Sequence, residues 1–255
     1  TSGTFIFPIV RFLFPKSTIT LNIAGLEWSR SKWGFFSSFL LKCFEKIGVK
    51  YAHNVIGDNE ALVDYILDQY GVHSHYIAYG GDQYSMLSTD KSFLKNLDLQ
   101  SKSYDLVICR AQPDNNLDII LNSYLDRSEI LVVVSNWQSS NYGKLIKSTY
   151  RKYDNIKLVG PFYDKVMIKT LLDHARIYVH GHSAGGTNPI LVSAMWSSVP
   201  IFCYDVVYNR CTTDNEALYF SNIKSLISLL DEFSFEYWQN KIKIILNIAH
   251  KKFRW

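Results

Sequence analysis

Two segments of the sequence combine residue types that could bind an anion. In the first, Arg110 directly follows the apolar run 104–109 (YDLVIC) and precedes the polar stretch AQPDNN. In the second, the run 176–181 (RIYVHG) leads into HSAGGTNP, where two glycines allow a tight turn and Pro189 suits the first position of a helix. An arginine fork and the free N–H groups of a helix start both suit a phosphate. The alternative for the first segment is an ordinary surface pair of Arg110 with Asp114.

The second segment also contains two histidines at alternate positions. His180 and His182 would point the same way on an extended chain, which is how a metal site could begin. No third ligand lies nearby in the sequence, so we expect no bound metal. The histidines are then either structural, or at least one of them forms a hydrogen bond or transfers a proton at the site.

A third segment whose residue types could bind a ligand is 24–34 (AGLEWSRSKWG), which follows the apolar run 17–23. Its charged residues and two tryptophans suit a polar, ring-shaped ligand held by stacking and hydrogen bonds. As an alternative, the tryptophans simply cover the helix that follows.

That helix, expected at 34–52, has an unusually large aromatic face flanked by basic residues. Such a face predicts contact with an anionic membrane surface, although a helix buried against a sheet would be equally apolar. The residues concerned are Trp33, Phe35, Phe36, Phe39, Leu40, Leu41 and Phe44, with Arg30, Lys32, Lys42, Lys46 and Lys50 around them. The basic, aromatic tail HKKFRW also suggests contact with an anionic membrane surface.

The elements around these segments alternate as in βαβ units of a parallel sheet. A polar stretch near 81–104 separates two such series, and the second series has five strands, which predicts a doubly wound domain that binds ligands beyond the carboxyl ends of its strands. Strands are expected at 17–23, 53–57, 75–80, 104–109, 129–135, 156–160, 176–181 and 200–205. Helices are expected at 34–52, 58–71, 114–125, 141–153, 164–175 and 188–198, with two or three more from Asn215 to Trp255.

Composition limits the class of protein. The 255 residues are 47% hydrophobic with a net charge of +4, and the basic residues form no long run, which argues against disorder and against a nucleic-acid partner. The four cysteines are dispersed, as in a reducing compartment, and no run of 18 apolar residues predicts a spanning helix. Residues 1–16 lack the pattern of a signal peptide, and the chain, which does not begin with Met, is expected to start inside a domain.

Several motifs together resemble a known family. GLEWSRSKW, YAHNVIGDNEAL, IAYGGDQ, VICRAQPDNN, VGPFYDKVMIKTLL and YVHGHSAGGTNPILVSAM occur in the order and spacing of retaining glycosyltransferases of family 4. They most resemble the rhamnosyltransferase-like branch of bacterial O-antigen and capsule biosynthesis. The resemblance covers about Ile19 to Phe220 and implies an α/β chain of GT-B fold, with two Rossmann-like domains facing a cleft and an incomplete N-terminal domain.

The resemblance also implies a domain division. Residues 1–88 would be the remainder of an acceptor-side domain, 89–103 a linker and 104–220 the nucleotide-sugar-binding domain. Residues 221–255 would form terminal helices, for which packing back on the first domain is left open.

By position, the resemblance assigns roles to individual residues. His182 and Ser183 would lie at the transferred sugar as catalytic residues, with no metal. The acceptor would meet Glu27, Trp28, Arg30 and Lys32. The donor would be bound by Arg110, Asn115, Gly185, Gly186, Thr187, Asn188, Ser193 and Glu216.

Three of these positions depart from the common pattern of the family. Serines stand at 183 and 193 where relatives often have glutamate, and Asn115 replaces a phosphate-binding lysine. A serine at 193 can still bind a ribose hydroxyl, but without the charge assistance of a carboxylate.

The implied activity is retaining transfer of a sugar onto an undecaprenyl-diphosphate-linked saccharide, in O-antigen or other lipopolysaccharide biosynthesis. A UDP-linked hexose or N-acetylhexosamine is favoured as donor, with dTDP-rhamnose as second candidate and no obligatory metal cofactor. The protein would be cytoplasmic and peripheral on the inner membrane surface. The alternatives are a non-catalytic nucleotide-sugar-binding partner subunit and a GT-B nucleotide-sugar epimerase.

Overall fold

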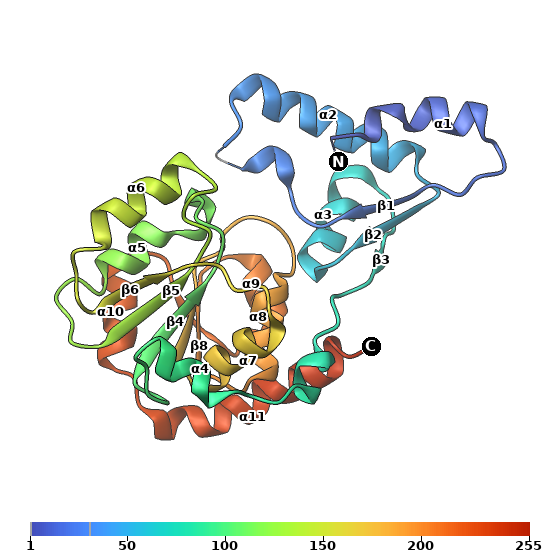
Figure 1. Ribbon diagram of the computed structural model, residues 1–255. Helices are drawn as coiled ribbons and strands as arrows, with labels where there is room; N and C mark the ends of the chain where they lie inside the picture. The colour runs from blue at the N-terminus through green and yellow to red at the C-terminus, as the bar shows by residue number, and fades with distance from the viewer. Residues whose placement is uncertain (1, 31) are drawn as a thin grey trace. The chain divides into compact units, whose positions relative to one another are not determined.

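The computed structural model describes residues 2–30 and 32–255, and these residues form two compact α/β units (Figure 1). Unit 1 extends to Tyr79 and also includes the short segment Ala184–Thr187. Unit 2 consists of Gly80–Ser183 and Asn188–Trp255. The chain therefore passes between the two units more than once.

Unit 1 is built on a three-stranded parallel sheet in the order β1-β2-β3, namely Thr20–Ile23, Asn54–Gly57 and His75–Tyr76. The crossover helices are α2 (Phe35–Tyr51) and α3 (Glu60–Tyr70), and a 3₁₀ turn, η2 (Glu27–Ser29), precedes α2. Asn59 caps α3 by accepting the N–H of Ala61, and Gly71 ends it with a φ of 64°.

The first residues of unit 1 form helices that the sequence pattern did not predict. A 3₁₀ turn, η1 (Thr4–Ile6), leads into α1 (Phe7–Leu13). Pro8 does not break this helix because it lies in the first turn, where a backbone N–H has no partner within the helix. The ring of Phe5 lies 5.2 Å from that of Phe44, so this segment packs beside α2.

Unit 2 contains a six-stranded parallel sheet in the order β6-β5-β4-β7-β8-β9. The strands are β4 (Tyr104–Ile108), β5 (Ile130–Val134), β6 (Ile156–Val159), β7 (Ile177–His180), β8 (Ile201–Tyr204) and β9 (Leu218–Phe220). The five expected strands are present, and β9 adds a sixth at the edge. The central strands are buried along nearly their whole length, which explains their continuous apolar runs.

Helices cover both faces of this sheet (Figure 1). They are η3 (Asp82–Met86), α4 (Lys91–Asn96), η4 (Pro113–Asn115), α5 (Leu117–Asn122), α6 (Asn141–Tyr150), α7 (Lys165–His174), α8 (Pro189–Trp196), α9 (Val207–Thr212), α10 (Ile223–Asp231) and α11 (Phe235–Lys252). Among the described residues, no helix is both long and apolar enough to cross a membrane.

The expected linker at 89–103 is part of unit 2. The N–H of Gly81 donates to the carbonyl of Phe253 (2.8 Å), and the N–H of Asp90 donates to Thr170 Oγ1 (3.0 Å). Lys157 Nζ binds the carbonyl of Leu97 at 3.1 Å. Because backbone groups across this polar stretch have partners in unit 2, the division falls between Tyr79 and Gly80 instead.

The terminal helices also belong to unit 2. Trp238 of α11 is fully buried, with its ring 6.2 Å from that of Phe202 in β8. Nearer the end of α11, the His250 ring lies 4.4 Å from the Trp196 ring of α8. Residues 221–255 therefore belong to unit 2.

Candidate functional site

The strand order of unit 2 reverses between its neighbouring strands β4 and β7. From β4 the sheet continues to β5 and β6, and from β7 it continues to β8 and β9. The loops that follow β4 and β7 therefore leave the carboxyl edge side by side at a topological switch point, where open α/β sheets bind ligands. These are the two loops that carry Arg110 and the HSAGG sequence.

Hydrogen bonds join the two loops directly. The N–H and the hydroxyl of Ser183 both donate to the carbonyl of Asp114, at 2.8 and 3.0 Å, and Asn116 Nδ2 donates to the carbonyl of Gly181 at 2.8 Å. A Cβ at Gly181 would lie 2.1 Å from the carbonyl oxygen of Asn115, so only glycine allows this approach. The backbone at the switch point is therefore held in a fixed geometry.

Four of the predicted site residues meet at this junction, namely Arg110, Asn115, His182 and Ser183. His182 is 9% exposed and its Nδ1 lies 3.2 Å from Asn115 Oδ1, while Asn115 Nδ2 donates to the carbonyl of Arg110 at 3.0 Å. Asn209, in α9, donates to the carbonyls of His182 and Tyr204. The Arg110 side chain itself is exposed, so its guanidinium is accessible to a ligand at this edge.

The structure gives His180 a structural environment. It is 3% exposed, and its Nδ1 lies 3.1 Å from the hydroxyl of Tyr178. Burial, with the nearby His182 as a smaller cause, holds the pKa of His180 well below its usual value, so the ring is neutral. Within residues 2–30 and 32–255, no group of three His, Cys, Asp or Glu side chains is placed to hold a metal ion.

Asn188 caps the start of α8, and Pro189 lies in its first turn as the sequence predicted. Asn188 Oδ1 accepts the N–H of Ile190 at 3.1 Å. Ser193, one turn later, is 3% exposed and donates its hydroxyl to the carbonyl of Pro189 at 3.0 Å. A ribose that bound Ser193 would have to exchange this hydrogen bond.

The glycine turn before α8 is grouped with unit 1. The N–H of Gly186 donates to the carbonyl of Ala24 at 3.3 Å, and a Cβ at Gly25 would lie 2.5 Å from Cα of Gly185. Gly185 has a φ of 113°, which L side chains rarely adopt. The sequence assigns Gly186 to the donor site. In this structure its N–H group instead donates to a protein carbonyl.

Thr187 forms hydrogen bonds with Asp58 and Asn59, the two residues that precede α3. Its hydroxyl donates to the carbonyl of Asp58 at 2.6 Å and accepts from Asn59 Nδ2 at 3.1 Å, and its N–H lies 3.4 Å from Asp58 Oδ1. Burial raises the pKa of Asp58 to about 6, although hydrogen bonds from the Thr187 N–H and the Tyr79 hydroxyl act against that rise. Asp58 is therefore a carboxyl group that can be neutral near pH 6.

Glu216 is not brought together with the other predicted donor residues. It precedes β9, the edge strand, and so lies at the amino end of that strand rather than at the edge where the β4 and β7 loops emerge. Its carboxylate forms an ion pair with Lys241 of α11, with Oε2 2.9 Å from Nζ.

The predicted acceptor residues gather beside β1 in unit 1. Glu27 pairs with Arg30 at 2.9 Å and with Lys32 at 2.6 Å, and Trp33 Nε1 donates to Glu27 at 3.1 Å. Burial alone would raise the pKa of Glu27, but the hydrogen bond from Lys32 and the charge of Arg30 bring it below its usual value. A cavity of about 390 Å³ adjoins this cluster, lined by Ser2, Asn22, Ala24, Gly25, Glu27, Arg30, Trp33 and Leu41.

Trp28, also predicted to contact the acceptor, is not part of this cluster. Its ring lies under the ammonium group of Lys42, 4.3 Å from the ring centroid, and it does not line the cavity. Trp28 therefore covers α2, as the alternative for the tryptophans predicted, whereas Trp33 takes part in the polar cluster.

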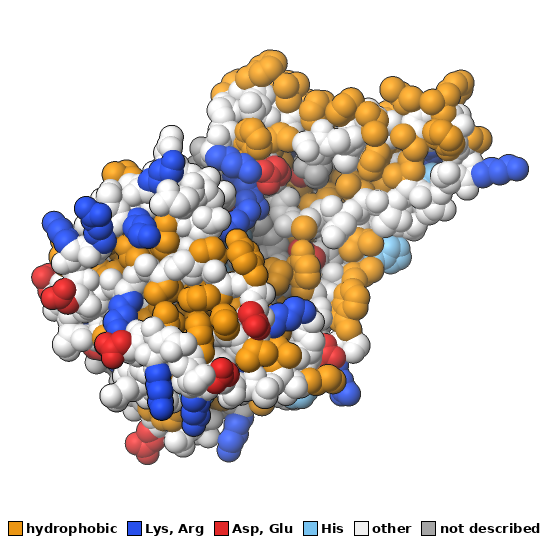
Figure 2. Space-filling view, viewed as in Figure 1, with side chains coloured by type: hydrophobic (Ala, Val, Ile, Leu, Met, Phe, Trp, Pro, Cys, Tyr) orange, Lys and Arg blue, Asp and Glu red, His pale blue; other side chains and the backbone are white. Residues whose placement is uncertain are grey.

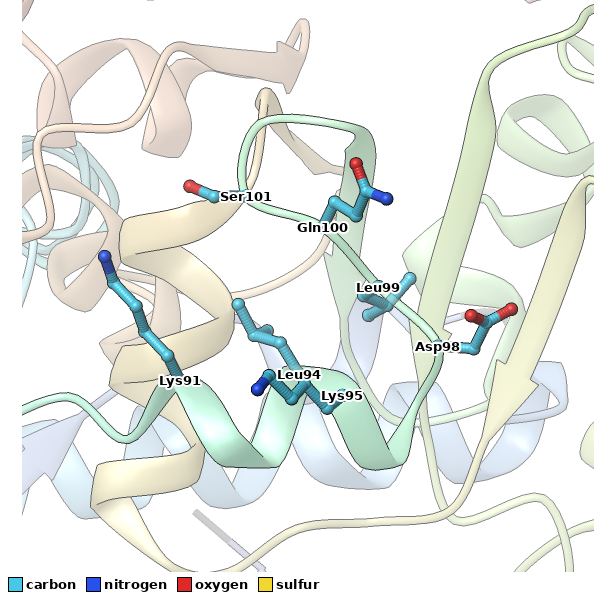
Figure 3. A pocket seen from close by; sticks show the side chains of 7 residues that line it. All are labelled: Lys91, Leu94, Lys95, Asp98, Leu99, Gln100 and Ser101. Carbon is cyan, nitrogen blue, oxygen red and sulfur yellow. The ribbon is translucent and has the colours of Figure 1, made fainter.

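A second cavity, of about 470 Å³, lies in unit 2 between α4 and the loop that leads to β4 (Figure 3). It precedes β4 and so lies at the amino end of the sheet, opposite the switch point. Its lining consists of Lys91, Leu94, Lys95, Asp98, Leu99, Gln100 and Ser101, none of which the sequence selected. We therefore do not assign the candidate site to it.

Sequence reasoning missed Asp58, Asn116, Gly181 and Asn209. Asn116 has a φ of 48°, a left-handed conformation that asparagine tolerates, and Asn209 lies just after β8. Asp58 directly follows β2, so an inspection of every post-strand segment could have selected it. Nothing in the sequence shows that Gly181 must approach another backbone.

A family model described as a domain of unknown function, DUF1972, matches residues 1–82. No curated protein sequence matches the chain significantly.

Many solved structures are similar in fold. HepE from Anabaena in complex with UDP-glucose is 14% identical, with a TM-score of 0.81 over 100% of this chain and 73% of that one. Sucrose-phosphate synthase from Thermosynechococcus elongatus is 13% identical, with a TM-score of 0.76 over 92% of this chain and 64% of that one. The pneumococcal O-GlcNAc transferase GtfA with UDP and GlcNAc is 12% identical, with a TM-score of 0.68 over 98% and 51%.

These similarities confirm the expected fold class. The chain has the GT-B fold of these glycosyltransferases, with two Rossmann-like α/β units built on parallel sheets. It spans only 51% to 73% of the length of the three structures. At these identities the likeness concerns the fold, and activity must be argued from the site.

Proposed function

We propose that this chain is part of a retaining glycosyltransferase that binds a nucleotide-activated sugar at the switch point of unit 2. The observation that supports this most is the junction of the β4 and β7 loops, where Asn115 contacts both the backbone of the exposed Arg110 and the ring of His182, and Ser183 bonds the neighbouring Asp114. The same fold holds UDP-glucose in HepE and UDP with GlcNAc in GtfA.

In this proposal each residue of the junction has a role. Arg110 binds the donor diphosphate and stabilises the negative charge that grows as the sugar leaves, while Asn115 positions the loop. His182 and Ser183 contact the transferred sugar, and Asn188 starts the helix whose dipole faces the phosphate. Ser193 binds the ribose after exchanging its bond to Pro189.

The reaction breaks the bond between the anomeric carbon and a phosphate oxygen and forms a bond from that carbon to an acceptor hydroxyl oxygen. The acceptor proton passes to the leaving phosphate, so no paired carboxylates are required. The proposed donor is a UDP-hexose or UDP-N-acetylhexosamine. The proposed acceptor is an undecaprenyl-diphosphate-linked saccharide of polysaccharide biosynthesis, recognised by the Glu27, Arg30, Lys32 and Trp33 cluster.

Calorimetry with UDP, dTDP and GDP tests the donor site. We expect UDP to bind most tightly, and absence of binding by all three nucleotides would refute the proposal. A donor screen with a lipid-diphosphate saccharide, read by mass spectrometry, then tests transfer. The anomeric configuration of the product, read by NMR, tests retention.

A second candidate is a non-catalytic protein that binds a nucleotide-sugar. It is favoured by Ser193, whose hydroxyl is used inside its own helix. Nucleotide binding without turnover of any donor, in the presence of the lipid-linked acceptor, would support this candidate over the transferase.

A further inference from the structure

The cavity of about 470 Å³ beside α4 in unit 2, which we call the α4 cavity, combines basic and apolar side chains. Its volume is in the range of small-molecule sites. Lys91 and Lys95, one turn apart on α4, supply two positive charges, while the buried Leu94 and Leu99 supply an apolar floor. Figure 3 shows both ammonium groups on the side of the cavity toward Ser101. Such a lining suits an anionic group attached to a small organic part.

The two lysine charges are not neutralised by the protein. In the part of the chain that the structure describes, neither the Lys91 nor the Lys95 ammonium group has a hydrogen bond or an ion pair. Nearby carboxylates are used elsewhere: Asp90 caps α4, and Asp98 pairs with Lys157 at 3.5 Å. Figure 3 shows the Asp98 carboxylate at the far end of the cavity, and Figure 2 shows basic side chains on the part of unit 2 where Figure 1 places α4.

Positive charge also surrounds His174, the last residue of α7. Burial lowers the pKa of His174, and the charge of Lys91 lowers it further. Lys102 and Lys169 act in the same direction, whereas Asp173 opposes them. The ring is therefore mostly neutral at pH 7. A bound anion would reduce this excess of positive charge.

Ser101 offers the cavity a hydroxyl group whose hydrogen is available. Its Oγ lies 2.9 Å from His174 Nδ1, and His174 Nε2 is buried with no hydrogen-bond partner among the described residues. Because a buried N–H without a partner is costly, we assign the ring hydrogen to Nδ1, which donates to Ser101 Oγ. The Ser101 hydroxyl can then donate to a ligand. The backbone next to it is fixed, since the N–H of Lys102 donates to the carbonyl of His174 at 2.7 Å.

We infer that the α4 cavity binds a small phosphate monoester. The phosphate contacts Lys91, Lys95 and the Ser101 hydroxyl, and the organic part lies on Leu94 and Leu99. A phosphate monoester carries close to two negative charges at pH 7, which matches the two unpaired lysines. A nucleotide fits less well, because none of the lining residues is aromatic and could stack on a base. The cavity lies at the amino end of the sheet, so this site is separate from the proposed donor site and does not depend on it.

Calorimetry with glycerol 3-phosphate on the full chain tests the inference, with glycerol as the neutral probe. We expect glycerol 3-phosphate to bind and glycerol not to bind, with weaker binding as salt is raised. Lys91→Gln with Lys95→Gln should weaken binding by at least about 10-fold, because two charge-assisted hydrogen bonds are lost. Binding should also raise the pKa of His174, measured by NMR titration of its ring, since the phosphate charge favours the protonated form.

The matched control is Lys243→Gln with Lys251→Gln, which removes two exposed lysines of α11 and should leave binding unchanged. Equal weakening in both double variants would show that only net charge attracts the phosphate, and would overturn the inference. Absence of glycerol 3-phosphate binding, or tighter binding of inorganic phosphate, would also overturn it. The Lys91 and Lys95 variant should bind UDP normally, whereas loss of glycerol 3-phosphate binding in Arg110→Ala would place the phosphate at the switch point instead.

Discussion

The candidate site combines one exposed cation with a junction of buried polar contacts. Arg110 has its backbone carbonyl bound by Asn115, whereas its guanidinium is exposed. Substitution at Arg110 therefore tests ligand binding with little effect on folding, unlike substitution at the residues that build the junction.

Arg110→Ala should weaken UDP binding by about 10- to 100-fold, since a charge-assisted hydrogen bond contributes about 1.5–3 kcal/mol. Calorimetry measures the loss, and an unchanged melting temperature shows that the fold is intact. Arg151→Ala, at an exposed arginine that ends α6, is the matched control and should bind UDP normally. Equal affinity in both variants would remove Arg110 from the donor site.

Asp58 predicts a pH dependence of stability. Because its pKa is raised to about 6 in the folded chain, the folded state binds a proton more tightly than the unfolded state does. Stability should therefore fall as pH rises from about 4 to about 6, by up to roughly 3 kcal/mol. Asp58→Asn stays neutral and can still accept the Thr187 N–H.

Thermal melting of Asp58→Asn across this pH range checks the prediction. The variant should melt like the parent near pH 4 and at a higher temperature above pH 6. Asp64→Asn, at an exposed carboxylate of α3, should leave the pH profile unchanged. A profile for Asp58→Asn that still follows the parent would show that another group is responsible.

At the scale of elements, the sequence predicted most of the fold because each strand of the parallel sheet is a short apolar run followed by a helical pattern. It missed β9, which has three residues, and α1, in which Pro8 lies in the first turn. It also placed the domain division within 89–103, because a polar composition does not show that backbone groups find partners far along the chain.

The site, like the fold, could be predicted where it depends on neighbouring residues in the sequence, but not where it depends on contacts between distant ones. Arg110 and His182 could be selected from the sequence because each follows a predicted strand, whereas only the structure gives the strand order that places their two loops side by side. The inward hydrogen bond of Ser193 and the ion pair of Glu216 with Lys241 could not, because both depend on side-chain packing.

Gly181→Ala tests the contact between the two loops. The added Cβ would lie 2.1 Å from a backbone oxygen of the β4 loop, which cannot move aside as a flexible side chain could. We expect a loss of about 1–3 kcal/mol in unfolding free energy, measured with denaturant, together with weaker UDP binding. Gly160→Ala, where a Cβ would meet nothing within 4 Å, is the control. Full stability of Gly181→Ala would mean that the two loops can separate at little cost.

At the scale of the whole molecule, ligand binding should stabilise the chain unevenly. If the donor site is in unit 2, UDP at 100 times its dissociation constant should stabilise that unit by about 2.7 kcal/mol. Hydrogen exchange should show the protection in the segments after β4 and β7, and protection confined to the cavity at Lys91–Ser101 would contradict the proposed site.

The proposed activity also predicts the effect of a chelator. Because Arg110 is proposed to neutralise the leaving diphosphate, transfer should survive EDTA with little loss of rate. A loss that added Mg²⁺ or Mn²⁺ restores would show that a metal supplies part of this charge, and Arg110→Ala would then be expected to depend on the metal more strongly.

The grouping of Ala184–Thr187 with unit 1 limits how such proteins can be recombined. In a chimaera that takes residues up to Tyr79 from one parent and the rest from another, the hydrogen bonds of Thr187 to Asp58 and Asn59 would join residues of different parentage. The glycine pair would likewise have to fit a foreign Gly25 and Asp58. Exchange of donor specificity between relatives should therefore require that this four-residue insert travel with the first unit, not with the second.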